Sequence, residues 1–193
     1  SPIYGAGSST QGGIVLPFYN DSSKFLILTT YGEDLGYNRG FRYSVINMNL
    51  YGGYGGIDSS QKNKIIRVPG LESVDVNGDT VFMTNEGISA INTCADNGYW
   101  IMVNGRISGK ADHHICVFKF DSSGLHFKDT FNIGITGSGS FRFSPDGSYL
   151  AFSHNDGVTC DIFPFDRSQG IVNTGSSNVI HVKGINGLAF SAN

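Results

Sequence analysis

Short alternations of hydrophobic and polar residues, separated by turn residues, run through most of this 193-residue chain. The clearest example is the segment 139–183. Phe141 and Phe143 flank a polar residue, a Pro-Asp-Gly sequence turns the chain, and a second apolar run follows at 149–154. Two apolar runs joined by a tight turn are typical of a β-hairpin. Further runs, which extend the hairpin to a predicted four-stranded unit, lie at 159–165 and 178–182.

This four-stranded pattern recurs along the chain. Its first strands align at Ile91, Phe141 and Leu188, which are 50 and 47 residues apart, close to the roughly 40 to 50 residues of propeller repeats. We therefore predict an all-β fold, a partial β-propeller that belongs to a seven- or eight-bladed ring. The single domain 1–193 is predicted to contain a blade at 11–69, an inserted hairpin at 70–87, a blade at 88–134, a blade at 139–183 and the first strand of a next blade at 187–193.

Strands with two apolar faces predict that further protein covers the ends of this array. In the run 24–31, Phe25 and Ile27 face one side while Leu26 and Leu28 face the other. Three blades and one strand do not close a ring, and soluble proteins avoid leaving such faces in water. The expected partner is the rest of the same propeller or another chain that completes the ring.

Composition excludes several classes of function. A net charge of -3 offers no clustered positive charge for nucleic acid, and no apolar run is long enough to span a membrane. Twenty-seven glycines with 15% charged residues favour short strands and tight turns over helices. The chain starts at Ser1 instead of Met, so we expect that a signal peptide or a longer segment has been removed. The three cysteines show no CxxC spacing and are expected to be buried free thiols.

Three motifs suggest cofactor or metal sites, and each has a simpler explanation. His113 and His114 are adjacent on a predicted strand, so their side chains point to opposite faces. Residues 75–86 resemble a calcium loop, but Thr80 stands where glycine is required, and Asn77-Gly78 indicates a hairpin turn. The glycine-rich segments lack the lysine and following helix of a phosphate loop. No catalytic residue, metal or cofactor is predicted.

Three segments carry a family resemblance: FRYSVINMNLYGGYGGI at 41–57, ISAINTCADNGYWIMV at 88–103 and FRFSPDGSYLAFS at 141–153. They resemble the N-terminal WD40-like β-propeller of large Bacteroidota surface proteins that carry a gliding-motility-type C-terminal sorting domain for type IX secretion. The resemblance implies an extracellular or cell-surface location and a role in adhesion or ligand capture. The chain departs from the family at Thr93-Cys94, where histidine is frequent, and in the inserted hairpin.

We accordingly predict a non-enzymatic binding or structural module that recognises a protein or a glycan through loops on one face. Loops between second and third strands gather at one end of a propeller, and recognition residues concentrate on such loops. The candidate contacts are Asp34, Tyr37, Arg39, Arg106, Lys110 and Asp156.

The alternative is a propeller enzyme, a lactonase or glycan-degrading hydrolase that uses channel carboxylates or a divalent metal. It requires acidic residues at the entrances of the innermost strands. The residues expected there are instead Gln11, Gly12, Ser89, Ser140 and Asn186.

Overall fold

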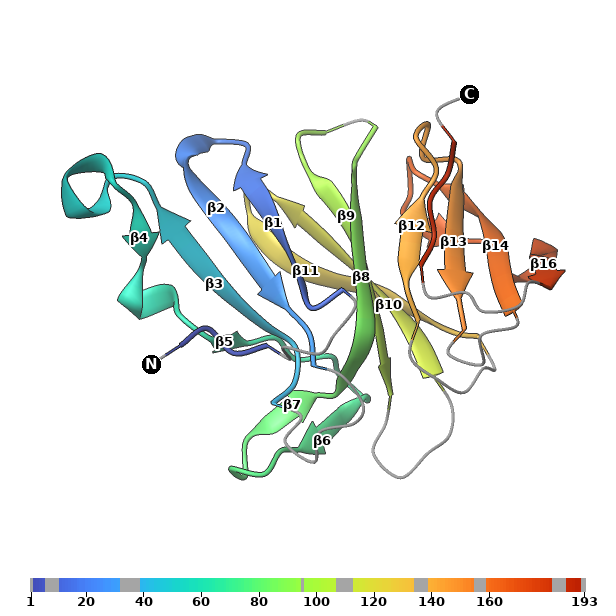
Figure 1. Cartoon of the computed structure of the whole chain (residues 1–193), viewed down its shortest axis with the longest axis horizontal. Coiled ribbons are helices and arrows are strands. Elements are labelled where there is room, and N and C mark those ends of the chain that lie inside the picture. The colour runs from blue at the N-terminus through green and yellow to red at the C-terminus, as the bar shows by residue number, and fades with distance from the viewer. Residues whose placement is uncertain are drawn as a thin grey trace.

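The chain is all-β throughout the part that the structure describes, as predicted from the sequence. The structure is a computed structural model, and it describes residues 2–5, 11–31, 39–94, 96–106, 113–133, 139–154, 159–181 and 187–191. Within these ranges the strands form three separate antiparallel sheets and one two-stranded hairpin, and the helical segments are short 3-10 turns. Figure 1 shows the three sheets side by side in chain order.

The first sheet has a divided outer edge, in place of the continuous fourth strand predicted at 63–68. The C-terminal end of β3 pairs with β4, and its N-terminal end pairs with β5. Between them a 3-10 turn, η2 (Ser59–Gln61), interrupts the strand pairing, and Asn63 adopts a left-handed φ of 52°. The strands are β1 (Gly13–Phe18), β2 (Asp21–Thr29), β3 (Arg42–Asn47), β4 (Gly56–Ile57) and β5 (Lys64–Ile65).

The second sheet starts earlier than its repeat pattern indicates. Its first strand begins at Thr84, whereas the sequence predicts a start at Ile88. Thr84 pairs with Gly105 and Ile88 pairs with Val103, so the three residues between them form a bulge that hides the alternation. The strands are β8 (Thr84–Asn92), β9 (Tyr99–Arg106), β10 (His113–Asp121) and β11 (Gly124–Asn132), preceded by the hairpin of β6 (Glu72–Val74) and β7 (Thr80–Phe82).

In the third sheet, β15 and β16 pair with different parts of β14. The segment 187–191, predicted to open a further blade, carries no strand assignment. Leu188 and Phe190 are partly buried there and alternate with exposed residues, so one side of this extended segment faces protein. The strands are β12 (Phe141–Phe143), β13 (Tyr149–Ser153), β14 (Thr159–Asp166), β15 (Ile171–Val172) and β16 (Asn178–His181).

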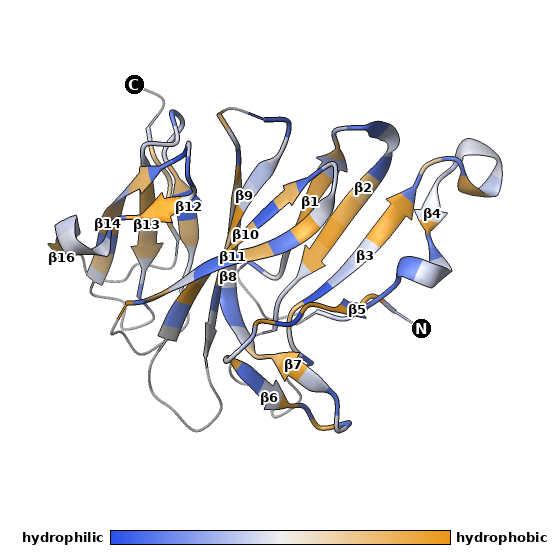
Figure 2. Cartoon of the chain, turned by 180° about the vertical axis from the view of Figure 1, so that it is seen from behind, coloured by the Kyte–Doolittle hydropathy of each residue, from blue (hydrophilic) through white to orange (hydrophobic). Residues whose placement is uncertain are grey.

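The middle sheet supplies both hydrophobic cores. On β9, Ile101 and Val103 belong to the core shared with the first sheet, whereas Trp100 and Met102 belong to the core shared with the third. Side chains alternate between the two faces of a strand, so every second residue enters the same core. Figure 2 shows these apolar positions along the strands of all three sheets. The sheets are therefore stacked face to face, and the middle one is covered on both sides.

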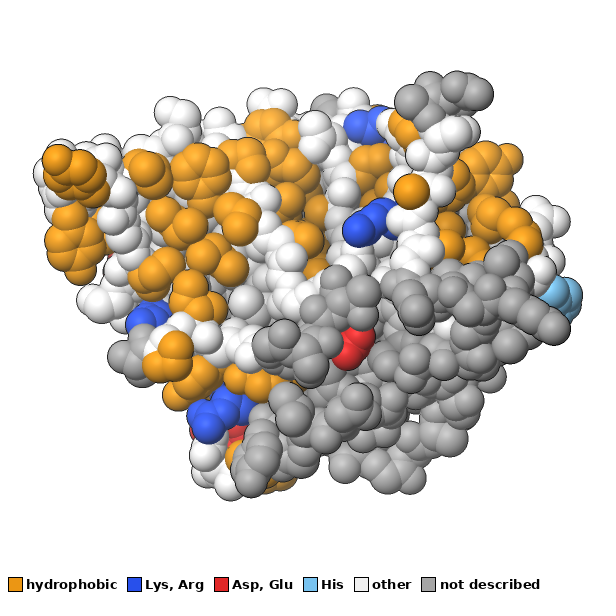
Figure 3. Space-filling view, in the orientation of Figure 1, with side chains coloured by type: hydrophobic (Ala, Val, Ile, Leu, Met, Phe, Trp, Pro, Cys, Tyr) orange, Lys and Arg blue, Asp and Glu red, His pale blue; other side chains and the backbone are white. Residues whose placement is uncertain are grey.

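The outer face of the first sheet is nearly as apolar as its inner face. Val15, which is 54% exposed, pairs with Ile27, and Phe25 pairs with Ile46 on the same face. In Figure 3 hydrophobic side chains cover the region over β1, β2 and β3. The core-facing residues of these strands, such as Leu26, are buried. This surface is suited to pack against another layer of protein.

The first strands of the three sheets converge, since β8 lies beside both β1 and β12. Gln11, just before β1, reaches the third sheet. Its Oε1 accepts the N–H of Phe141 at 2.9 Å, and its Nε2 donates to the carbonyl of the same residue at 3.3 Å. Close backbone contacts lie at the same point. A Cβ on Gly139 would stand 1.6 Å from the carbonyl oxygen of Ser153.

Asp-x-Ser sequences close five turns in the same way. In each, the serine N–H donates to the aspartate at 2.8–3.0 Å and the serine hydroxyl donates to the same carboxylate. Short polar side chains that bond their own backbone stabilise turns. The turns are Asp21-Ser23, Asp58-Ser60, Asp121-Ser123, Asp146-Ser148 and Asp166-Ser168.

Replacing Gly139 with alanine should destabilise the protein by about 3 kcal/mol or more, because the methyl group would displace backbone and not a flexible side chain. Gly187→Ala is the control, since no atom of the described residues lies within 4 Å of its added Cβ. Denaturant unfolding of both variants measures the difference. Equal stability of the two would contradict the close packing at the convergence of the sheets.

The aspartate turns predict a loss of stability in acid. Hydrogen bonds, first of all from the hydroxyls of Ser23 and Ser144, lower the pKa values of Asp21 and Asp146 to about 2. Since the unfolded pKa is about 3.9, this stabilisation is complete above that pH and is lost as the pH falls toward the folded value. Between pH 5 and pH 2 the melting temperature of Asp146→Ala should fall by less than that of the wild type. Identical decreases would rule out this contribution.

Candidate functional site

Buried polar residues gather at one end of the three sheets. At this end β2, β9 and β13 finish, β3, β10 and β14 start, and the innermost strands β1, β8 and β12 enter their sheets. Buried polar groups are costly unless they are hydrogen-bonded or functional, so their concentration marks this end as a candidate site. The residues concerned, each no more than 6% exposed, are Thr30, Thr84, Asn85, Asn104, Ser140, Ser153, His154 and Asp161.

Glu86 is the carboxylate that the fold places on an innermost strand. It lies in the bulge of β8, the strand between β1 and β12, and its side chain is partly exposed. Gly87, the next residue, has a φ of 120°, a conformation that favours glycine, and its backbone lies against Gly139. Bulges commonly re-aim side chains next to active sites.

A buried acid–base pair lies in the third sheet. Nε2 of His154 is 2.9 Å from Oδ2 of Asp161, and both side chains face the second sheet beside Phe152. The ring of Phe152 meets the imidazole edge to face, with centroids 5.0 Å apart. A carboxylate bonded to one ring nitrogen fixes the orientation of an imidazole. The pair is nevertheless 3% and 6% exposed, which suits a supporting role better than direct contact with a ligand.

Neighbouring hydrogen bonds connect the sheets at this end. The N–H of Tyr31 donates to the hydroxyl of Thr84 at 3.0 Å, joining the first sheet to the second. Within the third sheet, the N–H of Ser140 donates to Oγ of Ser153 at 3.0 Å. One of these hydrogen bonds joins two sheets and the other lies within the third sheet, and both lie near the entrances of the innermost strands.

Most of the sequence-predicted contacts lie outside the described residues. Asp34, Tyr37, Lys110 and Asp156 fall there, and Arg106 ends β9 but its side chain is not described. Arg39 is described and is partly buried: its guanidinium carbon lies 4.5 Å from the centre of the Tyr4 ring. This contact ties the N-terminal segment to the first sheet. Arg39 is thus the one predicted contact whose side chain the structure describes, and the grouping of the six residues stays a prediction.

The acidic residues of the hairpin bind an arginine. Oδ1 of Asp75 accepts the backbone N–H groups of Asn77 and Asp79, at 2.8 and 2.9 Å. The guanidinium of Arg42 lies 3.6 Å from Asp75 and 3.5 Å from Asp79, so it links the hairpin to β3. Among the described residues, no group of three or more His, Cys, Asp or Glu side chains could hold a metal ion.

The cysteines differ in their surroundings. Cys116 and Cys160 are buried and free, and burial raises the pKa of Cys116 to about 12 and also raises that of Cys160. Cys94 is exposed, so the expectation that all three are buried is wrong. It lies after β8 has ended, where the strand alternation no longer applies.

Sequence reasoning missed Glu86 because it assigned residues 70–87 to the inserted hairpin. No clear signal was available, because Asn85 and Gly87 on either side of Glu86 are typical turn residues. It also missed His154 and Asp161, whose positions could have been found by extending the alternation of Phe152 and Phe163 along their strands. A polar residue in an apolar stripe faces the core and requires a partner.

Comparison with known proteins shows a likeness of fold. No protein-family model and no curated protein matches the chain. Among solved structures, the periplasmic gluconolactonase of Pseudomonas aeruginosa is 15% identical, with a TM-score of 0.50 over 89% of this chain and 40% of its own. A GH43 β-1,3-galactosidase solved with galactodeoxynojirimycin is 12% identical, with a TM-score of 0.54 over 95% of this chain and 66% of its own.

A second GH43 β-1,3-galactosidase is also 12% identical, with a TM-score of 0.52 over 92% of this chain and 39% of its own. These neighbours are β-propeller enzymes, and this chain spans less than two thirds of the length of each. The described chain contains no helix long and apolar enough to cross a membrane.

Removing the carboxylate of the buried pair should destabilise the protein. Asp161→Ala leaves the imidazole of His154 without its partner in a buried site, and we expect a loss of about 1–3 kcal/mol. Asp129→Ala, at an exposed position on β11, is the control and should cost less than about 0.5 kcal/mol. Denaturant unfolding measures both. Equal losses would contradict a structural role for the pair.

Proposed function

We propose that this chain forms consecutive blades of a β-propeller hydrolase that acts on a carbohydrate or a sugar lactone, with Glu86 as one of its channel carboxylates. The observation that carries the proposal is the position of Glu86 on the bulged entrance of β8, where the three sheets converge. The alternative of the sequence analysis required an acidic residue at this place. The non-enzymatic function predicted first is accordingly the second candidate.

The sheet arrangement supports the propeller. Three antiparallel sheets follow one another in the chain, each stacked on the previous one, and their first strands approach each other at one edge. Radial sheets around a central channel have this geometry. The propeller enzymes described above resemble the chain over most of its length, which supports the same assignment.

The chemistry assigned to Glu86 is proton transfer. In glycoside hydrolysis, a carboxylic acid protonates the leaving oxygen while water adds to the anomeric carbon with the help of a second carboxylate. Opening of a lactone similarly needs a base that accepts a proton from the attacking water. Glu86 is the acidic residue of the innermost strands β1, β8 and β12. A glycosidase needs a second carboxylate, and we assign it to blades beyond the three described sheets.

The outer face of the first sheet supports a ring with further blades. Val15, Phe25, Ile27 and Ile46 form an apolar surface of the kind that the middle sheet buries on both sides. We propose that the rest of the propeller, or another chain, covers this face. A complete ring would also bring a second set of inner strand entrances to the channel.

A second candidate function is ligand capture without catalysis. The glycine-rich turn after β3 exposes Tyr51 to 75% and Tyr54 to 90%, and Tyr51 has a left-handed φ of 54°. Exposed aromatic rings on a rigid scaffold are suited to protein or glycan contact. The cell-surface location and the type IX secretion implied by the family resemblance stay predictions.

The test of the proposal is the substitution Glu86→Gln, which keeps the shape of the side chain but cannot donate or accept the proton. We expect hydrolysis of a β-1,3-linked galactobiose or of gluconolactone by the assembled protein to fall by about 10²- to 10⁴-fold. Melting temperature should stay close to that of the wild type. Glu72→Gln, on the exposed β6, is the matched control and should retain full activity.

Absence of hydrolysis by the wild type, or full activity of Glu86→Gln, would reject the enzymatic proposal. Sugar binding that persists without hydrolysis, and that is lost in Tyr51→Ala and Tyr54→Ala, would favour the second candidate instead.

A further inference from the structure

A cleft of about 430 Å³ opens between the first and second sheets, at the end away from the entrance of β1. It differs in position and in residues from the site around Glu86. From its lining we propose that this cleft is a separate binding site for a neutral, hydroxylated ring of sugar size. The volume lies within the range of about 300–1,000 Å³ that is usual for small-molecule sites.

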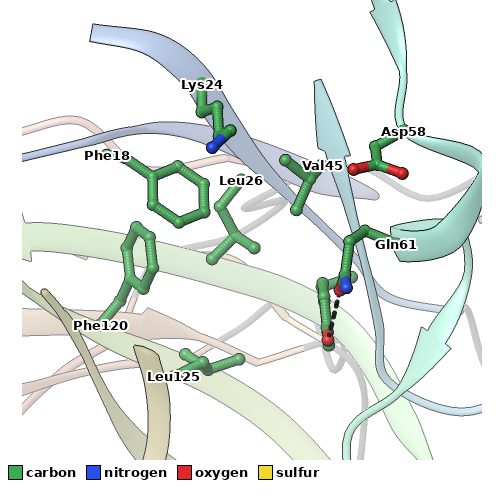
Figure 4. Close-up of a pocket in the computed structure, with 9 residues that line it drawn as sticks. Phe18, Lys24, Leu26, Val45, Asp58, Gln61, Phe120 and Leu125 are labelled. Atoms are coloured by element: carbon green, nitrogen blue, oxygen red, sulfur yellow. Dashed lines mark hydrogen bonds between the residues drawn. The ribbon is translucent and has the colours of Figure 1, made fainter. Parts of the chain in front are cut away.

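The floor of the cleft is apolar. Phe18 from β1, Leu26 from β2 and Val45 from β3 meet Phe120 and Leu125 from the second sheet (Figure 4). The rings of Phe18 and Phe120 are perpendicular, with centroids 4.9 Å apart. Phe18 and Leu125 are only partly buried by the protein, although both border the first hydrophobic core. A ligand with a C–H face would cover the area that they leave open.

The aromatic floor continues to the protein surface. Tyr99 lies 6.3 Å from Phe120, and Tyr19 lies 5.0 Å from Tyr99, measured between ring centroids. Tyr19 is 41% exposed. A line of rings therefore leads from the cleft to solvent, and aromatic faces pack well against the C–H groups of ring-shaped ligands.

The opposite wall of the cleft is polar. Asp58 and Gln61 line it, and Figure 4 shows them across the cleft from the two phenylalanines, while Lys24 lies beside Phe18. The hydroxyl of Tyr43 donates to Oε1 of Gln61 at 3.1 Å, which orients the amide and leaves its nitrogen as a donor. The lining of the cleft thus offers an ammonium, an amide donor and a carboxylate. These groups match the alternating donors and acceptors of ring hydroxyls.

The charges of this wall select against an anionic ligand. The ammonium of Lys24 lies 2.9 Å from Asp21, and this hydrogen-bonded pair raises the pKa of Lys24. Hydrogen bonds led by the hydroxyl of Ser60 lower the pKa of Asp58, so it stays ionised. Asp21, which does not line the cleft, already neutralises the ammonium of Lys24, so an incoming anion would meet the uncompensated carboxylate of Asp58. A neutral polyol meets no such penalty.

The experiment is a titration of the protein with methyl β-D-galactopyranoside, followed by the backbone NMR shifts of the cleft residues. We expect saturable shifts at Leu26, Gln61 and Leu125. Two comparison ligands should each bind at least about tenfold more weakly. Benzoate has an apolar ring but is an anion without hydroxyls, and cyclohexanol has a ring with a single hydroxyl. Shifts absent from these residues, or stronger binding of either comparison ligand, would overturn the proposal.

Two variants locate the binding. Leu125→Trp should fill the cleft and abolish the shifts, while Ile171→Trp, a similar change on the third sheet, should leave them unchanged. Gln61→Ala, on a surface turn outside the core, should weaken binding by about five- to tenfold with little change in melting temperature. Wild-type affinity in both cleft variants would contradict the site.

The ligand class matches that of the proposed function, but the cleft does not depend on Glu86. In Glu86→Gln the cleft shifts should persist even if hydrolysis is lost. Loss of the cleft shifts in that variant would show that the sugar binds at the inner end and would reject the separate site.

Discussion

The structure depends on a middle sheet that is apolar on both faces. On β9 and β10 successive side chains enter alternate cores, and large residues such as Phe118 and Met102 are almost completely buried. Burial of one such side chain contributes about 1.5–3 kcal/mol, so neither face can be left in water. The first and third sheets supply the two covers. Stacking, and the convergence of β1, β8 and β12, follow from this requirement.

The same constraint positions the candidate site. Because the innermost strands enter their sheets at one end, their polar residues meet where the three sheets converge. Bonds such as that from Gln11 to Phe141, together with glycine contacts at residues 87 and 139, hold the entrances closely together. The bulge of β8 then presents Glu86 at this point. The proposed catalytic role therefore depends on this local irregularity in one strand.

Much of the fold could be predicted from the sequence, because alternating apolar and polar residues indicate the strands and turn residues indicate where they end. Most strands of the second and third sheets and the turn at Asn77-Gly78 follow such patterns. The division of the outer edge into β4 and β5 has no such signal, since it depends on which part of β3 each short strand reaches.

The candidate site was harder to predict for a related reason. The extra residues of the bulge interrupt the alternation of apolar and polar residues in β8. The recognisable alternation therefore starts only at Ile88, and the sequence places Glu86 in the hairpin. His154 lies just past the last residue of β13, and Asp161 stands in an otherwise apolar stripe. The six loop residues predicted as ligand contacts rest on loop position alone, and they stay a prediction because most of them lie outside the described residues.

An experimental structure of the protein in its native assembly tests the central claim most directly. If the three sheets are blades of a ring, a further β-sheet will pack against Val15, Phe25 and Ile27, and β1, β8 and β12 will line a central channel to which Glu86 is open. A structure in which that face lies in solvent or against a helix, or in which the first strands line no channel, would contradict the propeller.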